Sequence, residues 1–208
     1  MRAVQDHAVV QVNLTDISGN NILPQHVEVH KAGSYIHNYF GASMDADSID
    51  NIIIDCAVSI APDGTITAVL PRGHYYMLVT DALDKNGAVI EINIGYEDLG
   101  TICEYTEIAT SFETEETGRV RFQVRSSQSG RILGNVNVEI RDGFDNRYGD
   151  HVATLELDEF YRFTISMLNI DLPYGAYTII VTDDAGNETQ TNLIVDDAFV
   201  YNVIYHAQ

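Results

Sequence analysis

The chain has 208 residues and 45% of them are hydrophobic, so it can bury a core, and disorder is a poor interpretation. Its 31 acidic and 11 basic side chains give a formal net charge of −20, which disfavours nucleic acids and anionic membrane surfaces as partners. No stretch reaches the roughly 18 apolar residues of a membrane-spanning helix, and the first residues lack the apolar core of a secretory signal.

Short runs in which apolar and polar residues alternate recur along the chain, and this period of two predicts β-strands. The segments expected to form strands are, in chain order, 9–14, 27–29, 89–94, 120–125, 136–140, 176–181, 193–195 and 201–205. Turn-forming pairs such as Ser18-Gly19 and Asn86-Gly87 separate several of them. Because no long segment has a 3.6-residue period, the predicted fold class is all-β.

Two parts of the chain match each other, which indicates a duplicated unit. Residues 70–81 and 172–183 are identical at seven of twelve positions, at an offset of 102. Upstream segments match at an offset of 111, so the first copy carries about nine extra residues; they fall within 33–63, where 41–47 is expected to form a loop. The predicted organisation is a first sandwich over 1–109, an acidic linker over 110–117 and a second sandwich over 118–208.

The turn motifs of the second copy occur in a characteristic order. A Ser129-Gly130 turn leads toward the strand near Val136, and a Leu-Pro-x-Gly-x-Tyr segment follows at 172–177. This order resembles the transthyretin-like (prealbumin-like) group, which includes carboxypeptidase-regulatory-like domains and the B-type repeats of bacterial surface proteins. The resemblance covers nearly all of the second copy and implies two tandem Ig-like or prealbumin-like antiparallel β-sandwiches. Its motifs specify fold more than activity.

One candidate metal site lies on a single predicted strand. If Val27 and Val29 face the core, then His26, Glu28 and His30 share the outer face. Neighbours on one face of a strand lie roughly 6.5–7 Å apart, a spacing that imidazole and carboxylate groups can bridge around zinc or copper. The alternative is an ordinary solvated strand face.

A second candidate is a calcium site at Asp45, Asp47 and Asp50, and acidic turns near 142–146 and 183–187 offer similar oxygen atoms. Calcium takes about six to eight oxygen ligands, and the spacing of an EF-hand is absent. Acidic residues in turns more often only build the turn. The expected cofactor is therefore none, with calcium as the alternative that these acidic residues leave open.

Catalysis has no support in the spacing of the residues, so the chain is predicted not to be an enzyme. A Gly-x-Ser-x-Gly elbow, a phosphate-binding glycine-rich loop and a His-Glu-x-x-His motif are all absent. A triad that only folding assembles stays open. The two cysteines, Cys56 and Cys103, form either one disulfide or two small buried apolar groups.

The leading hypothesis is a non-catalytic structural or adhesive module of a larger extracellular, cell-surface or virion assembly, with other protein subunits as partners. Tandem sandwiches expose sheet edges suited to docking and strand addition. Two versions are a bacterial surface or pilus segment and a phage decoration or fibre-type protein, and the plain start at Met1 favours the second. The alternative, from another class, is a secreted module that binds carbohydrate or calcium.

Overall fold

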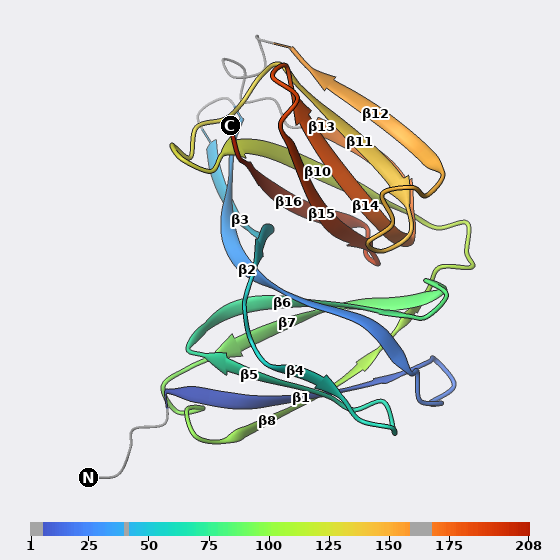
Figure 1. Ribbon diagram of the computed structural model, residues 1–208. Helices are drawn as coiled ribbons and strands as arrows, with labels where there is room; N and C mark the ends of the chain where they lie inside the picture. Colours follow the sequence, from blue (N-terminus) through green and yellow to red (C-terminus); the bar gives the residue numbers. More distant parts are fainter. Residues whose placement is uncertain (1–5, 40–41, 159–167) are drawn as a thin grey trace. The chain divides into compact units, whose positions relative to one another are not determined.

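A computed structural model of the chain describes residues 6–39, 42–158 and 168–208, and this part contains strands and no helix (Figure 1). The predicted all-β fold class is confirmed. The contacts divide the chain into two compact units, one comprising Met1–Lys31 and Ile53–Glu113, the other Ala32–Ile52 and Thr114–Gln208. The sequence prediction placed 32–52 in the first sandwich, whereas in the structure this segment belongs to the second unit.

The first unit is a sandwich of two sheets around one apolar core. Its strands are β1 (His7–Thr15), β2 (Pro24–Tyr39), of which the first half belongs here, β4 (Val58–Ile60), β5 (Ile66–Pro71), β6 (Gly73–Asp81), β7 (Asn86–Ile94), β8 (Ile102–Ile108) and β9 (Thr110–Ser111). One sheet has the order β4-β5-β1-β8, and in the other β2, β6, β7 and β9 lie side by side. Because β1 alternates, Val10 and Val12 point inward and pack in one cluster with Met77 and Val79 of β6.

The second unit is also a sandwich. Its strands are β3 (Ala42–Ile53), β10 (Thr117–Ser126), β11 (Val136–Asp142), β12 (His151–Leu157), β13 (Leu168–Pro173), β14 (Gly175–Asp183), β15 (Glu188–Val195) and β16 (Phe199–His206). One layer has the order β13-β10-β16-β3 and the other β12-β11-β14-β15. Val120 and Phe122 of β10, Val138 and Ile140 of β11 and Ile179 of β14 are all buried, which places the core between the layers.

The strands of the two units pair in the same order. In the first unit β1 pairs antiparallel with β5 and parallel with β8, and in the second β10 pairs antiparallel with β13 and parallel with β16. The series β2-β6-β7 is likewise matched by β11-β14-β15. Residues 70–81 and 172–183 thus occupy equivalent places. The parallel pairs differ from the predicted antiparallel sandwiches, because an alternating pattern does not specify strand direction.

The Leu-Pro-x-Gly-x-Tyr motif forms the connection between the two layers in both units. The hydroxyl of Tyr75 donates a hydrogen bond to the carbonyl oxygen of Pro71 at 3.1 Å, and that of Tyr177 donates to Pro173 at 2.7 Å. The tyrosine ring packs on the motif's glycine: a Cβ added at Gly73 would lie 2.5 Å from the Tyr75 hydroxyl. Burial raises the pKa of Tyr177 to about 12.

The segment predicted as a loop within the first copy's insertion is a strand. β3 runs from Ala42 and pairs parallel with β16, Ile49 opposite Asn202 and Asp50 opposite Val203. The side chain of Asn51 extends this pairing, since its Oδ1 accepts from the Tyr205 N–H at 2.9 Å and its Nδ2 donates to the Tyr205 carbonyl oxygen at 3.3 Å. β16 therefore has a neighbour on each side.

The predicted acidic linker is built into the two units. Thr110–Ser111 is β9, the N–H of Phe112 donates to the carbonyl oxygen of Lys85 at 2.8 Å, and Lys85 forms an ion pair with Glu113. From the other side, the carbonyl oxygen of Glu116 accepts from the Tyr174 N–H at 3.0 Å. Because backbone groups engage most of the segment, it is not a free tether.

Candidate functional site

The first metal candidate lies on one face of β2, as the sequence predicted. Val29 belongs to the core cluster and Val27 packs against it, so His26, Glu28 and His30 share the opposite face. That face is not simply solvated, because the His30 side chain is fully buried and its Nε2 lies 2.9 Å from Glu28 Oε2. Among the described residues, the three side chains do not form a group whose ligand atoms converge. A metal site here stays a prediction.

The aspartates of the second candidate have different surroundings. Asp47 is exposed, whereas Asp50 is buried and accepts a hydrogen bond at 3.0 Å from the Ser48 hydroxyl. The Asp50 carboxylate also packs on the backbone of Gly33, where an added Cβ would lie 2.3 Å from Oδ1. The side chain of Asp45 is outside the described residues. Asp50 therefore has a place in the packing of β3, and calcium binding stays a prediction.

Aspartates that begin turns are held by backbone N–H groups. Asp16 Oδ1 accepts from the N–H groups of Ser18 and Asn20, both at 2.8 Å. Asp183 Oδ1 accepts in the same way from Ala185 at 3.0 Å and Asn187 at 2.8 Å. In both turns the side-chain amide of the asparagine donates to Oδ2, and these hydrogen bonds hold the pKa of each aspartate below its usual value. The turn interpretation accounts for these acids without an ion.

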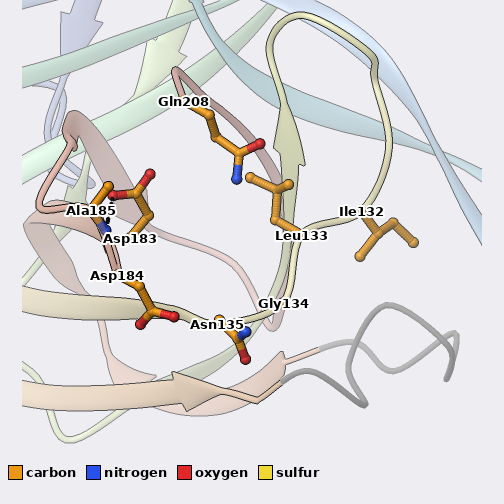
Figure 2. A pocket seen from close by; sticks show the side chains of 8 residues that line it. All are labelled: Ile132, Leu133, Gly134, Asn135, Asp183, Asp184, Ala185 and Gln208. Atoms are coloured by element: carbon orange, nitrogen blue, oxygen red, sulfur yellow. Dashed lines mark hydrogen bonds between the residues drawn. The ribbon is translucent and has the colours of Figure 1, made fainter.

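A cavity of about 400 Å³ in the second unit is bounded by the turn at Asp183 and the chain end at Gln208 (Figure 2). His206 lies next to Asp183 and is fully buried. Its Nδ1 is 2.8 Å from Thr189 Oγ1, and its Nε2 is 3.5 Å from Asp183 Oδ2. Sequence analysis missed this row, because its members come from three different strands and only folding brings them together.

A carboxylate, an imidazole and a hydroxyl in a row is the constellation of many hydrolases. Here the ring of His206 has no exposed surface, and the Thr189 hydroxyl oxygen also accepts from the Ala207 N–H at 3.4 Å. The row therefore ties β14, β15 and β16 together at the end of the chain. A substrate has no access to the ring in this arrangement.

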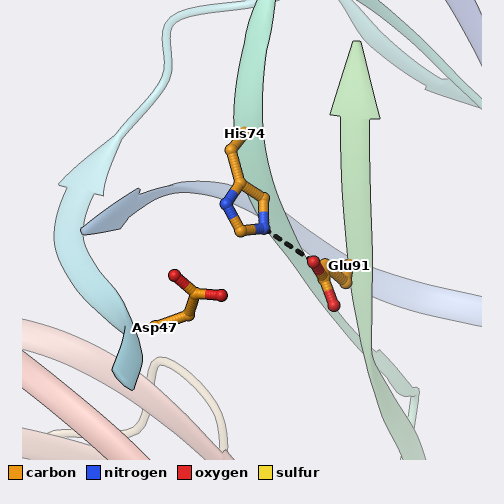
Figure 3. Close-up of side chains that lie close together, drawn as sticks. All are labelled: Asp47, His74 and Glu91. Carbon is orange, nitrogen blue, oxygen red and sulfur yellow. Dashed lines mark ion pairs between the residues drawn. The ribbon is translucent and has the colours of Figure 1, made fainter. Parts of the chain in front are cut away.

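A second histidine–carboxylate pair lies in the first unit. His74 of β6 and Glu91 of β7 point toward one another, with Nε2 at 2.9 Å from Oε1 (Figure 3). Both side chains are partly exposed. The pair links two neighbouring strands across the sheet surface.

Cys56 and Cys103 do not form a disulfide. Both are free thiols that are partly buried and pack against the core of the first unit. Burial raises the pKa of the Cys56 thiol, with the negative charge of Asp55 as a further cause. The structure therefore agrees with the second of the two alternatives, in which the cysteines are small apolar groups and not a disulfide.

The outer edge of β8 is one of the sheet edges at which a partner strand can pair. β8 ends its sheet, next to β1, and among the described residues no strand pairs with its other side (Figure 1). The N–H of Val9 donates to Thr101 at 3.0 Å and that of Ala109 to Thr15 at 2.8 Å, so the odd-numbered residues of β8 face β1. The backbone groups of the four residues of opposite parity point outward; these are Ile102, Glu104, Thr106 and Ile108.

The side chains along this edge are exposed and of mixed character. Ile102 is 60% exposed and Ile108 is 63% exposed, with Glu104 and Thr106 exposed between them. Beside the start of β8 a cavity of about 230 Å³ is lined in part by Val9, Val69 and Ile102. A strand that paired here would cover apolar surface as well as backbone groups.

Within the described ranges, no helix has the length and apolar sequence needed to cross a membrane.

No protein-family model matches the chain, and no curated protein matches it. Solved structures with some likeness include the TIE protein of Bacillus anthracis, with 15% identity, a TM-score of 0.35 and coverage of 98% of this chain and 34% of that one. A streptococcal ancillary pilin has 11% identity and a TM-score of 0.32, with 98% and 62% covered. GBS52, a minor pilin of Streptococcus agalactiae, has 13% identity and a TM-score of 0.30, with 97% and 96% covered.

This chain spans about a third of the length of the first of these proteins (34%) and less than two thirds of the second (62%). At TM-scores this low, the likenesses carry no conclusion about the function of this chain.

Proposed function

We propose that this chain is a non-catalytic structural module of a protein assembly outside the cytoplasm and that its partners are other protein subunits. One observation carries the proposal: the last strand of the second unit, β16, is completed by β3, which comes from a distant part of the chain. A strand supplied to the open edge of a sheet is a general means of joining protein modules. Within this chain, β3 and β16 are joined in the same way.

The chemistry-bearing side chains described above support a non-catalytic role. His206 is buried next to Asp183, His30 is buried beside Glu28, and the turn aspartates accept hydrogen bonds from backbone N–H groups. Each of these groups stabilises a strand or a turn. None combines an exposed nucleophile with a base in the arrangement that catalysis needs.

The proposal has two versions that differ in the assembly, a bacterial surface or pilus structure and a virion. Immunogold labelling of intact cells and of phage particles from the source, with antibodies against this chain, tests both. We expect label on the outer surface of one of the two. Protein found only in the cytoplasmic fraction, with no labelled surface or particle, overturns the proposal.

The alternative, a module that binds carbohydrate or calcium, stays a prediction with a different outcome. A glycan-array hit, or a rise in melting temperature specific to calcium, would support it. Concentration-dependent ordered assembly without added ligand, measured by sedimentation velocity, would support the structural role.

A further inference from the structure

β8 and β16 are equivalent strands of the two units, and the register of their pairing relates them residue by residue. Cys103 lies opposite Val10 of β1, and Asn202 lies opposite Phe122 of β10. Val10-Gln11-Val12 also matches Phe122-Gln123-Val124 in sequence. Cys103 therefore corresponds to Asn202, and the residues that follow correspond in order.

On this register, Glu104 of β8 corresponds to Val203 and Thr106 corresponds to Tyr205. In the second unit these two places are occupied, since Val203 pairs with Asp50 and both backbone groups of Tyr205 bond to the Asn51 side chain. In the first unit the same places face outward without a paired strand among the described residues. The structure thus contains one filled and one open copy of the same edge.

Charge decides which strand fits the open copy. A segment like β3 would place an aspartate opposite Glu104, and like charges directly opposite one another destabilise a pair of strands. A lysine or arginine at that position would instead form a cross-strand ion pair. The chain's net charge of −20 also favours a basic partner over a second copy of the same chain.

We propose that the outer edge of β8 binds an extended basic segment of a separate protein as an added parallel strand. The segment places Lys or Arg opposite Glu104 and apolar side chains opposite Ile102 and Ile108, which are exposed on the same face. Thr106 supplies the outward N–H and carbonyl groups at the centre of the site. This inference rests on the proposed function, for which it names the partner's chemistry and the place of contact.

The test uses the full chain and two labelled nonapeptides that differ in one residue. The first is Thr-Val-Thr-Lys-Thr-Thr-Thr-Val-Thr and the second has Glu in place of Lys. In fluorescence anisotropy titrations we expect the lysine peptide to bind about tenfold more tightly, because it exchanges a like-charge pair for an ion pair. In Glu104→Lys the preference should reverse. Equal affinity of the native chain for both peptides, or no binding of either, overturns the proposal. Glu104 would then be a charge that keeps other strands from pairing with an open edge.

Thr106→Pro removes the outward N–H while leaving the bonds to β1 intact, because proline is tolerated where a strand's N–H faces solvent. We expect it to weaken binding of the lysine peptide by at least about tenfold. Thr106→Val keeps the backbone donor and is the matched control, expected within about twofold of the native affinity. Native-like binding by Thr106→Pro contradicts strand addition.

If Thr106→Pro does not fold, hydrogen exchange on the native chain gives the same answer. The lysine peptide should slow exchange of the Glu104 and Thr106 amides, and unchanged exchange overturns the proposal. Sedimentation of the chain alone tests the remaining occupant. Self-association that slows exchange of the Glu104 and Thr106 amides would assign the edge to a second copy and overturn the proposal. Failure here with surface labelling retained rejects only this site, whereas absence of labelling rejects the proposed function whatever the peptides do.

Discussion

At the scale of single residues, Tyr177 shows how one side chain closes the connection between two layers. Its hydroxyl reaches the Pro173 carbonyl oxygen at 2.7 Å and is buried against the chain. The Leu-Pro-x-Gly-x-Tyr motif was recognisable in the sequence, and the structure adds that Gly175 leaves room for the tyrosine ring. The row formed by Thr189, His206 and Asp183 could not be predicted in the same way, because no local pattern links residues on three strands.

Tyr177→Phe should lower the free energy of unfolding by about 1 kcal/mol, the usual contribution of one hydrogen bond. The folded-state pKa of Tyr177 is about 12, above its ordinary value of 10.0. A raised pKa contributes stability that is present below pH 10 and is lost as the pH rises toward 12. Urea denaturation between these pH values should show a smaller loss in the variant. Tyr148→Phe, at a side chain that is 90% exposed, is the control; equal alkaline slopes in the native chain and Tyr177→Phe would contradict the assignment.

We predict that replacing Asn202 and replacing Asn192 with leucine change the free energy of unfolding in opposite directions. Both are buried, but Asn202 Oδ1 has no hydrogen-bond partner among the described residues, whereas Asn192 Oδ1 accepts from the Asp145 N–H at 2.8 Å. Asn202→Leu should raise the free energy of unfolding by about 1 kcal/mol, because an unsatisfied polar atom leaves the core. Asn192→Leu should lower it by about 1–3 kcal/mol. Chemical denaturation measures both, and effects of equal sign would rule out this account.

At the scale of elements, a strand was predictable where its own residues favour a strand. It was not predictable where pairing with another strand is what stabilises it. β10 alternates apolar and polar residues over its own length, so its sequence alone predicts a strand with a buried face. β3 begins with small and acidic residues of low strand propensity, and its pairing with β16 supplies the order that its sequence lacks. The positions of His26, Glu28 and His30 on one face were predictable from the strand period. The burial of His30 was not, because a local alternating pattern does not say how the outer face of a strand is covered.

Asn51→Ala tests the pairing of β3 with β16. Loss of the two bonds to the Tyr205 backbone should lower the free energy of unfolding by about 1–2 kcal/mol. Hydrogen exchange of the Tyr205 amide should become faster, since Asn51 Oδ1 is its acceptor. Asn93→Ala removes a single exposed side-chain bond and should change little. An unchanged Tyr205 exchange rate in Asn51→Ala would show that the side chain does not hold the edge.

At the scale of the whole molecule, 31 acidic side chains against 11 basic ones make self-repulsion a general feature of the fold. Divalent cations such as calcium and magnesium should weaken this repulsion by screening the negative charges. The acidic turns that the structure describes use their carboxylates to hold the turn, so we expect equimolar CaCl₂ and MgCl₂ to raise the melting temperature equally. Differential scanning calorimetry measures this. A rise with calcium alone would establish a specific site and favour the binding-module alternative.

The chain passes from one compact unit to the other three times, at 31–32, 52–53 and 113–114. A protease that cuts any one of these crossings leaves the two units joined by the other two. A chain of this kind can lose one peptide bond at a crossing and still keep its two units connected.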